Sequence, residues 1–174
     1  MSILDKSRTS TQTVALVGIL VALALIFSYI EVLIPFNFGI PGVKLGLANL
    51  VIVISFYMLS VRDTFIIECI KIAVTSFLFG TFMSFMYSLC GGLLSFIVML
   101  IMKKTSRFST MGISIAGGVF HNIGQLGVAV VILGTPKLMY YLPVLLVSGL
   151  VTGALIGIIA GAVLNRIGHL SKSI

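Results

Sequence analysis

Long runs of apolar residues dominate the chain, and short polar segments separate them. A helix needs about 20 mostly apolar residues to cross the hydrocarbon core of a bilayer. Runs near this length occupy residues 13–30, 45–61, 64–80, 82–102, 111–133 and 142–164. Their residues do not alternate between apolar and polar, as they would in the strands of a membrane barrel. The pattern therefore predicts six transmembrane helices.

Composition strengthens this prediction. Charged residues make up 9% of the chain and apolar residues 59%, whereas a soluble domain carries roughly 25% charged residues. This scarcity of charge excludes a soluble enzyme, a disordered chain and a nucleic-acid-binding protein. Few residues remain between the runs, so we expect one all-α domain over residues 1–174, a compact bundle of six membrane helices.

The first run raises the question of a signal peptide. Lys6 and Arg8 precede it, as basic residues precede the apolar part of a cleaved leader. The apolar residues continue to Ile30, however, and five further runs follow. We therefore expect this run to be a membrane helix that the protein keeps.

Basic residues are distributed unevenly between the two ends of the predicted bundle. With six spans, both tails lie on one side of the membrane, and that side collects Lys6, Arg8, Arg62, Lys103, Lys104, Arg107, Arg166 and Lys172. The opposite side collects only Lys44 and Lys137. Lys and Arg in short loops are retained on the cytoplasmic side, so both termini should be cytoplasmic. The net charge of +7 is thereby explained without a nucleic-acid partner.

The third run contains two ionisable residues, Glu68 and Lys71. They are three residues apart, so they share one helix face and can form an ion pair. Charged groups within a span usually face the bundle interior or a water-filled cavity. The pair could fix the packing of helices, or Lys71 could face a ligand while Glu68 holds it in position.

The fifth run contains a second polar group, formed by His121, Asn122 and Gln125. Gly117, His121 and Gln125 recur every four residues and therefore lie along one stripe of the helix. Such side chains can form hydrogen bonds between membrane helices. Their concentration near the middle of the span favours a role in facing a ligand or cation.

Polar residues also surround the start of the second run. Lys44 lies at the external rim and Asn49 lies further inside, while Glu31 and Asn37 belong to the long external connection before them. Prolines and phenylalanines in this connection could form a stiff loop over an external pocket. The alternatives are a lysine that extends to the interface and an interfacial aromatic belt.

Small residues recur along three of the runs and would let helices approach closely. The sixth run has Gly149, Gly153, Gly157 and Gly161, the fourth has Gly91, Gly92 and Ser95, and the first has Ala15, Gly18 and Ala22. One such face should serve internal packing, and a second is available to a partner protein.

The chain lacks the residues that several kinds of chemistry require. The chain has no phosphate-binding loop for ATP, and its only aspartates are Asp5 and Asp63, which excludes paired-aspartate chemistry. Cys69 and Cys90 lie within predicted spans without a spaced Cys/His cluster, so we expect buried thiols and neither a metal nor another cofactor. We expect no catalytic residues, and a protein that binds a molecule rather than an enzyme.

Two segments carry a family resemblance. Residues 41–49 (PGVKLGLAN) and 121–125 (HNIGQ), with Phe79-Gly-Thr and residues 88–95, resemble hallmarks of the bacterial Gx transporter family, which is also labelled heptaprenyl diphosphate synthase component I. That family is similar to the S components of energy-coupling-factor (ECF) transporters. The resemblance covers nearly the whole chain and implies a six-helix protein of the bacterial cytoplasmic membrane. It also implies that the loop after the first helix covers a substrate taken from outside, and that a transmembrane coupling subunit and cytoplasmic ATPases are partners.

These lines of reasoning select candidate residues. The expected substrate-binding residues are Lys44, Asn49, Lys71, His121, Asn122 and Gln125, supported by Glu31, Asn37 and Glu68. By the resemblance, Ala15, Gly18 and Ala22 form the face that docks to the coupling subunit, although Ile19 interrupts their spacing. The basic members favour an anionic or polar-headed ligand.

Two other functions stay open. The chain could be an accessory membrane subunit of an enzyme of prenyl diphosphate or quinone metabolism, although it lacks the aspartates of a prenyl-chain synthase. It could also be a proton-coupled carrier in which Glu31, Glu68 and His121 relay protons.

Overall fold

The computed structural model describes residues 9–33 and 46–172, with side chains as far as residue 168. These residues form six α-helices and one 3-10 helix, with no strand among them. The helices are α1 (Ser10–Leu33), α2 (Leu47–Met58), α3 (Val61–Phe79), α4 (Phe82–Lys104), α5 (Thr110–Leu133), η1 (Pro136–Tyr141) and α6 (Leu142–Lys172). The all-α prediction is confirmed for the described residues, and each predicted run overlaps one α-helix.

The helices differ in their ability to span a bilayer. Four segments are long and apolar enough to do so, namely α1, α4, α5 and the continuous segment from η1 through α6. By contrast, α2 has 12 residues, and α3 carries four charged residues along its length, Arg62, Asp63, Glu68 and Lys71. The chain is therefore a multi-pass helical membrane protein in which four helices have the full length and apolar character of membrane spans.

Helix α2 is shorter than the predicted run of residues 45–61. It begins after Gly46, whose φ of 73° lies in the left-handed region, and ends before Leu59, whose backbone is extended. Residues 51–56 are buried without interruption. A helix that is apolar on every side is normally surrounded by other elements, and α2 packs against α1, α3, α5 and α6.

Hydroxyl side chains start the helices that follow. Ser60 accepts a hydrogen bond from the backbone N–H of Asp63 at the start of α3, Thr81 accepts one from Ser84 in α4, and Ser109 accepts one from Gly112 in α5. Each bond satisfies a backbone donor that has no partner within its own helix. These polar residues between apolar runs therefore set the points at which the chain reverses direction.

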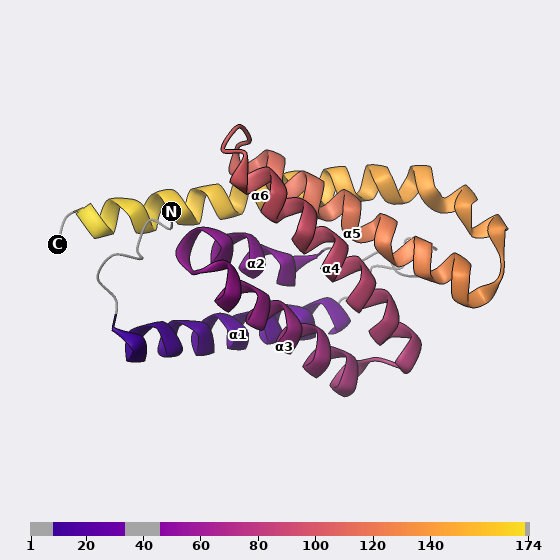
Figure 1. Cartoon of the computed structure of the whole chain (residues 1–174), viewed down its shortest axis with the longest axis horizontal. Coiled ribbons are helices and arrows are strands. Elements are labelled where there is room, and N and C mark those ends of the chain that lie inside the picture. The colour runs from indigo at the N-terminus through magenta and orange to yellow at the C-terminus, as the bar shows by residue number, and fades with distance from the viewer. Residues whose placement is uncertain (1–8, 34–45, 173–174) are drawn as a thin grey trace.

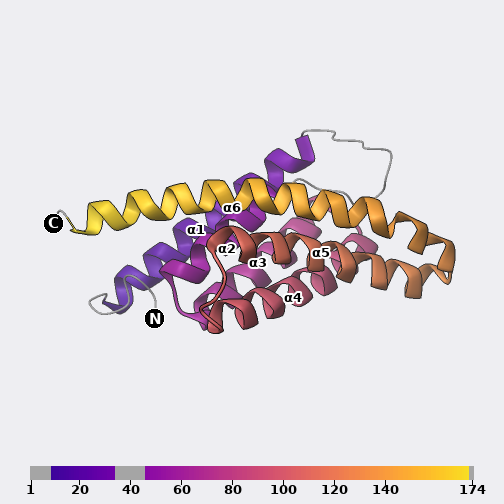
Figure 2. The same ribbon diagram turned by 90° about the horizontal axis from the view of Figure 1, so that it is seen from above.

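The helices lie side by side along the long axis of the molecule (Figure 1). Helix α5 lies between α4 and α6, whereas α1 packs against α2 and α3. The start of α1 and the end of α6 lie at the same end of the bundle, as both views show (Figures 1 and 2). Described basic residues gather at this end, with Arg62 beginning α3 and Lys103 ending α4, while Lys137 lies at the opposite end.

Glycines bring α6 against α5. A Cβ atom added to Gly149, Gly153 or Gly157 would stand 2.9, 2.7 and 2.6 Å from backbone atoms of α5. Nothing lies within 4 Å of the corresponding position on Gly161. The first three glycines of the predicted stripe therefore form the contact with α5, and Gly161 lies outside it.

Candidate functional site

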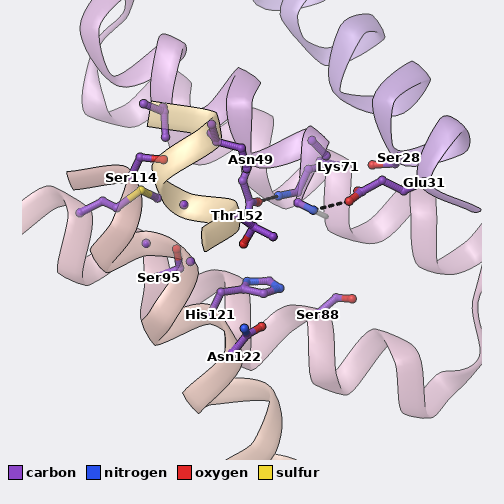
Figure 3. Close-up of a pocket in the computed structure, with 18 of the residues that line it drawn as sticks. Ser28, Glu31, Asn49, Lys71, Ser88, Ser95, Ser114, His121, Asn122 and Thr152 are labelled. Carbon is purple, nitrogen blue, oxygen red and sulfur yellow. Dashed lines mark hydrogen bonds between the residues drawn. The ribbon is translucent and has the colours of Figure 1, made fainter. Parts of the chain in front are cut away.

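Polar side chains from all six α-helices line a central pocket (Figure 3). The pocket has a cavity volume of about 70 Å³. Its polar lining consists of Ser28, Glu31, Asn49, Lys71, Thr75, Ser88, Ser95, Ser114, His121, Asn122 and Thr152. Ser28, Glu31 and Ser88 lie toward one end of the pocket, and Ser95 and Ser114 toward the other (Figure 3).

At the first of these ends, Glu31 caps a neighbouring helix. Its Oε1 atom accepts hydrogen bonds from the backbone N–H groups of Gly46 and, at 3.0 Å, of Leu47. These donors belong to the N-terminus of α2, where the helix dipole favours a negative charge. Gly46 adopts a left-handed conformation at this terminus. Glu31 thus fixes the end of α1 to the start of α2, and its charge has a partner there.

Lys71 joins two helices in the pocket wall. Its Nζ atom lies 2.6 Å from Oε2 of Glu68 on α3 and donates a hydrogen bond of 3.1 Å to Oδ1 of Asn49 on α2. Both charged residues are buried, with 7% of Lys71 and 2% of Glu68 exposed. A buried charge needs a partner because its transfer out of water costs several kcal/mol. The ion pair that was predicted from the spacing of Glu68 and Lys71 is therefore present. It neutralises the charge of the Lys71 ammonium group.

Two adjacent glycines of α4 make room for these polar groups. A Cβ atom on Gly92 would stand 2.5 Å from Oε1 of Glu68. A Cβ atom on Gly91 would stand 2.8 Å from Cγ of Gln125 and from the carbonyl oxygen of His121. The small surface predicted on α4 therefore lets the polar residues of α3 and α5 lie directly against its backbone.

The polar group of α5 divides between the pocket and the helix interfaces. His121 lines the pocket, and its Nε2 atom lies 3.0 Å from Nε2 of Gln125 one turn away. Gln125 is buried against Gly91 of α4 and is not among the residues that line the pocket. Asn122 also lines the pocket, and its amide donates a hydrogen bond of 2.8 Å to the carbonyl of Leu145 on α6.

The structure brings together most, but not all, of the candidate residues. Asn49, Lys71, His121 and Asn122 line one pocket with Glu31, while Glu68 and Gln125 contact lining residues without lining the pocket themselves. The remaining candidates, Asn37 and Lys44, lie outside the described residues.

The candidate docking residues lie elsewhere. Ala15, Gly18 and Ala22 are exposed on α1, and nothing lies within 4 Å of the Cβ position of Gly18. They are not among the residues of the central pocket.

Sequence reasoning missed the hydroxyl residues of the pocket. Ser28, Thr75, Ser88, Ser114 and Thr152 resemble ordinary residues of an apolar helix, where a hydroxyl can bond to a carbonyl of its own helix. Thr75 does so with Lys71 at 2.6 Å, and Thr152 does so with Ser148 at 2.9 Å. Their helical spacing from the charged and glycine positions was the available signal, since residues four and seven apart share a face.

Among the described residues, no group of three His, Cys, Asp or Glu side chains is placed to hold a metal ion. Cys69 and Cys90 are free thiols. The chemistry of the pocket is therefore that of hydroxyl, amide and imidazole groups around one ion pair and one capping carboxylate.

Fold and pocket together define the class of this chain, a helical membrane protein with a polar pocket enclosed by its helices. The sequence model of the family described as heptaprenyl diphosphate synthase component I matches residues 20–163. The chain belongs to this family. The matched region contains every residue that lines the pocket. No curated protein and no solved structure matches the chain.

Proposed function

We propose that the protein is the substrate-binding membrane subunit of an ECF-type importer and captures a small polar-headed molecule from outside the cell. The observation that carries this proposal is the convergence of six helices on one polar pocket. Pockets that bind small molecules combine apolar walls with a few fixed polar groups. Here Lys71 is fixed by Glu68 and Asn49, and contacts with these two residues leave one of its three donors to address a ligand.

Binding, rather than catalysis, is the role that these residues favour. The pocket charges are held in pairs or caps, and a prenyl-chain synthase would need paired aspartates. Asp63 instead lies in the first turn of α3, where its carboxylate accepts a hydrogen bond of 2.7 Å from Ser60. The protein is accordingly proposed not to be an enzyme.

The distribution of basic residues supports an orientation. The end that carries Arg62, Lys103 and Arg166 would face the cytoplasm, together with both termini, in the cytoplasmic membrane of a bacterium. Glu31 and Ser88 lie in the opposite half of α1 and α4. The pocket would then open toward the outside.

The exposed face of α1 would serve the energy-coupling partners. Ala15, Gly18 and Ala22 form a smooth surface there, and small residues permit close approach of another membrane helix. We propose that this face contacts the transmembrane coupling subunit, which in turn joins cytoplasmic ATPases.

The family description supports a second candidate, an accessory subunit beside an enzyme of prenyl diphosphate or quinone metabolism. Purification of the full chain from its native membranes separates the two functions. Co-elution of an ATPase and a coupling protein would support the importer. Co-elution of a prenyl synthase without them would contradict it.

The proton-coupled carrier requires groups that exchange protons freely. Glu31 and Glu68 are instead engaged by backbone amides and by Lys71. Uptake of a ligand by the purified chain alone, in proteoliposomes under a pH gradient, would support the carrier. A lack of uptake under these conditions would indicate that transport depends on partner proteins.

A further inference from the structure

Three cavities adjoin one another between the core and the outer surface of α3 and α4. The central pocket shares Ser28, Glu31, Thr75 and Ser88 with a second cavity, which α1, α3 and α4 enclose. The second cavity is also lined by Ser76, Ser84, Val32 and Phe79. It continues the hydroxyl lining of the central pocket and begins to add apolar side chains.

The third cavity is an open groove at the turn between α3 and α4. It shares Ser76 and Gly80 with the second cavity and is otherwise lined by Ala73, Phe77, Thr81, Phe82 and Phe85. Phe77 and Phe82 are 88% and 75% exposed, so the groove carries two aromatic rings on the outer surface of the bundle. The lining thus changes from polar in the bundle centre to aromatic at the outer surface.

Small residues separate the second cavity from the groove. A Cβ atom on Gly80 would stand 3.1 Å from Cα of Ser76 and 3.2 Å from Oγ of Ser84. These three small residues are closely packed, so the gap between α3 and α4 is narrow there, and a single bulky side chain would fill it. On the neighbouring side, Tyr29 of α1 contacts Phe79 of α3 with ring centroids 5.4 Å apart.

The charges of the central pocket are already compensated. Lys71 pairs with Glu68 at 2.6 Å, and Glu31 bonds to the N-terminus of α2. Among the described lining residues, a ligand therefore meets hydroxyl, amide and imidazole groups and the remaining donor of the paired Lys71, rather than an uncompensated cation. These groups suit a head that forms hydrogen bonds and carries no net charge.

We propose that the ligand is an amphiphile, with a small uncharged polar head in the central pocket and an apolar chain that passes between α3 and α4 into the bilayer. This inference rests on the proposed binding function and names the class of molecule that the pocket takes. It implies lateral exchange of the ligand with the membrane.

Photolabelling of the full chain in phosphatidylcholine nanodiscs tests the proposal. The probe is a long-chain monoacylglycerol that carries a diazirine in its acyl chain. We expect saturable labelling of the segment 75–88. An excess of unlabelled monoacylglycerol should reduce this labelling to a low level by competition. Ser76→Phe should reduce this labelling to the level that remains under competition, because the ring fills the gap.

Matched variants separate the gap from general effects on the protein. Ile70→Phe adds a ring to an exposed position of the same helix, outside the three cavities, and should retain saturable labelling. Ser84→Phe fills the gap from α4 and replaces Ser76→Phe if that variant does not elute as a folded protein.

Labelling confined to the outer residues Phe77 and Phe82, without competition, would overturn the proposal. So would saturable labelling that both gap-filling variants retain. If either occurs while the ATPase and coupling protein still co-elute with the chain, the lateral amphiphile is wrong and the importer function stands. If neither protein co-elutes but labelling is saturable, the importer function fails instead.

Discussion

Glu68 on α3 and Gly92 on α4 occupy adjoining space, so that a Cβ atom on the glycine would stand 2.5 Å from the carboxylate Oε1. The other oxygen of this carboxylate lies 2.6 Å from Nζ of Lys71. The absence of a side chain at Gly92 of α4 therefore permits a buried ion pair on the neighbouring helix α3. Through this pair, it also permits the placement of Lys71 in the pocket wall.

Replacing Gly92 should disturb this arrangement. Gly92→Ala forces the carboxylate away from α4, and we expect a loss of about 1–3 kcal/mol in the free energy of unfolding, as for other overpacked positions. The protein is purified in a mild detergent and then denatured, and circular dichroism measures the change in its free energy of unfolding. Gly161→Ala is the matched control, because its added Cβ meets nothing within 4 Å. Equal stability of both variants would show that Gly92 is not a packing position.

The ion pair itself can be tested for separate structural and binding roles. Lys71→Met leaves Glu68 buried without its partner and should cost about 3–5 kcal/mol. The double variant Lys71→Met/Glu68→Met removes both charges and should recover most of that loss. If Lys71 also contacts the ligand, the double variant should fold and yet retain less ligand after purification. A double variant that retains ligand like the unmodified chain would make the pair purely structural.

Glu31 should control the start of α2. Glu31→Ala removes the acceptor for the N–H groups of Gly46 and Leu47, and we expect the helix terminus to lose about 0.5–2 kcal/mol, the range for lost N-terminal caps. Hydrogen–deuterium exchange should therefore become faster at the first amides of α2 while the end of that helix is unchanged. Glu31→Gln keeps an acceptor oxygen and serves as the control. Unchanged exchange in Glu31→Ala would contradict the capping role.

Gln125 should act through His121. Gln125→Met removes the partner 3.0 Å from Nε2 of the imidazole, and loss of one such hydrogen bond costs about 0.5–1.5 kcal/mol. We expect ligand retention to fall while the protein stays folded, because the imidazole that faces the pocket loses one of its orienting contacts. His121→Ala should lose at least as much ligand. Full ligand retention by Gln125→Met would refute the positioning role.

Periodicity and charge predicted much of this structure. The apolar runs located six α-helices, and the three-residue spacing of Glu68 and Lys71 indicated their ion pair, which is present. The concentration of polar residues at 121–125 also identified a segment that contributes His121 and Asn122 to the pocket. These features depend on neighbours within one helix, which is the information that a single sequence carries.

Contacts between helices could not be predicted in the same way. Glu31 was expected in the external connection after the first helix, yet it lies within α1 and caps α2, a contact set by the position of α1 beside Gly46. The hydroxyls of Ser88 and Thr152 join one pocket only because α4 and α6 lie on either side of α5. The run at 45–61 gave no sign that its helix would have only 12 residues, because the boundaries depend on backbone conformation at Gly46 and Leu59.

Native mass spectrometry of the full chain, purified from its native membranes, tests the central claim most directly. The chain should carry a small molecule whose bound fraction falls in His121→Ala and stays unchanged in Gly161→Ala, with both variants equally folded. A chain that carries no molecule, or one that all three proteins retain equally, would contradict the assignment of the central pocket as a substrate-binding site.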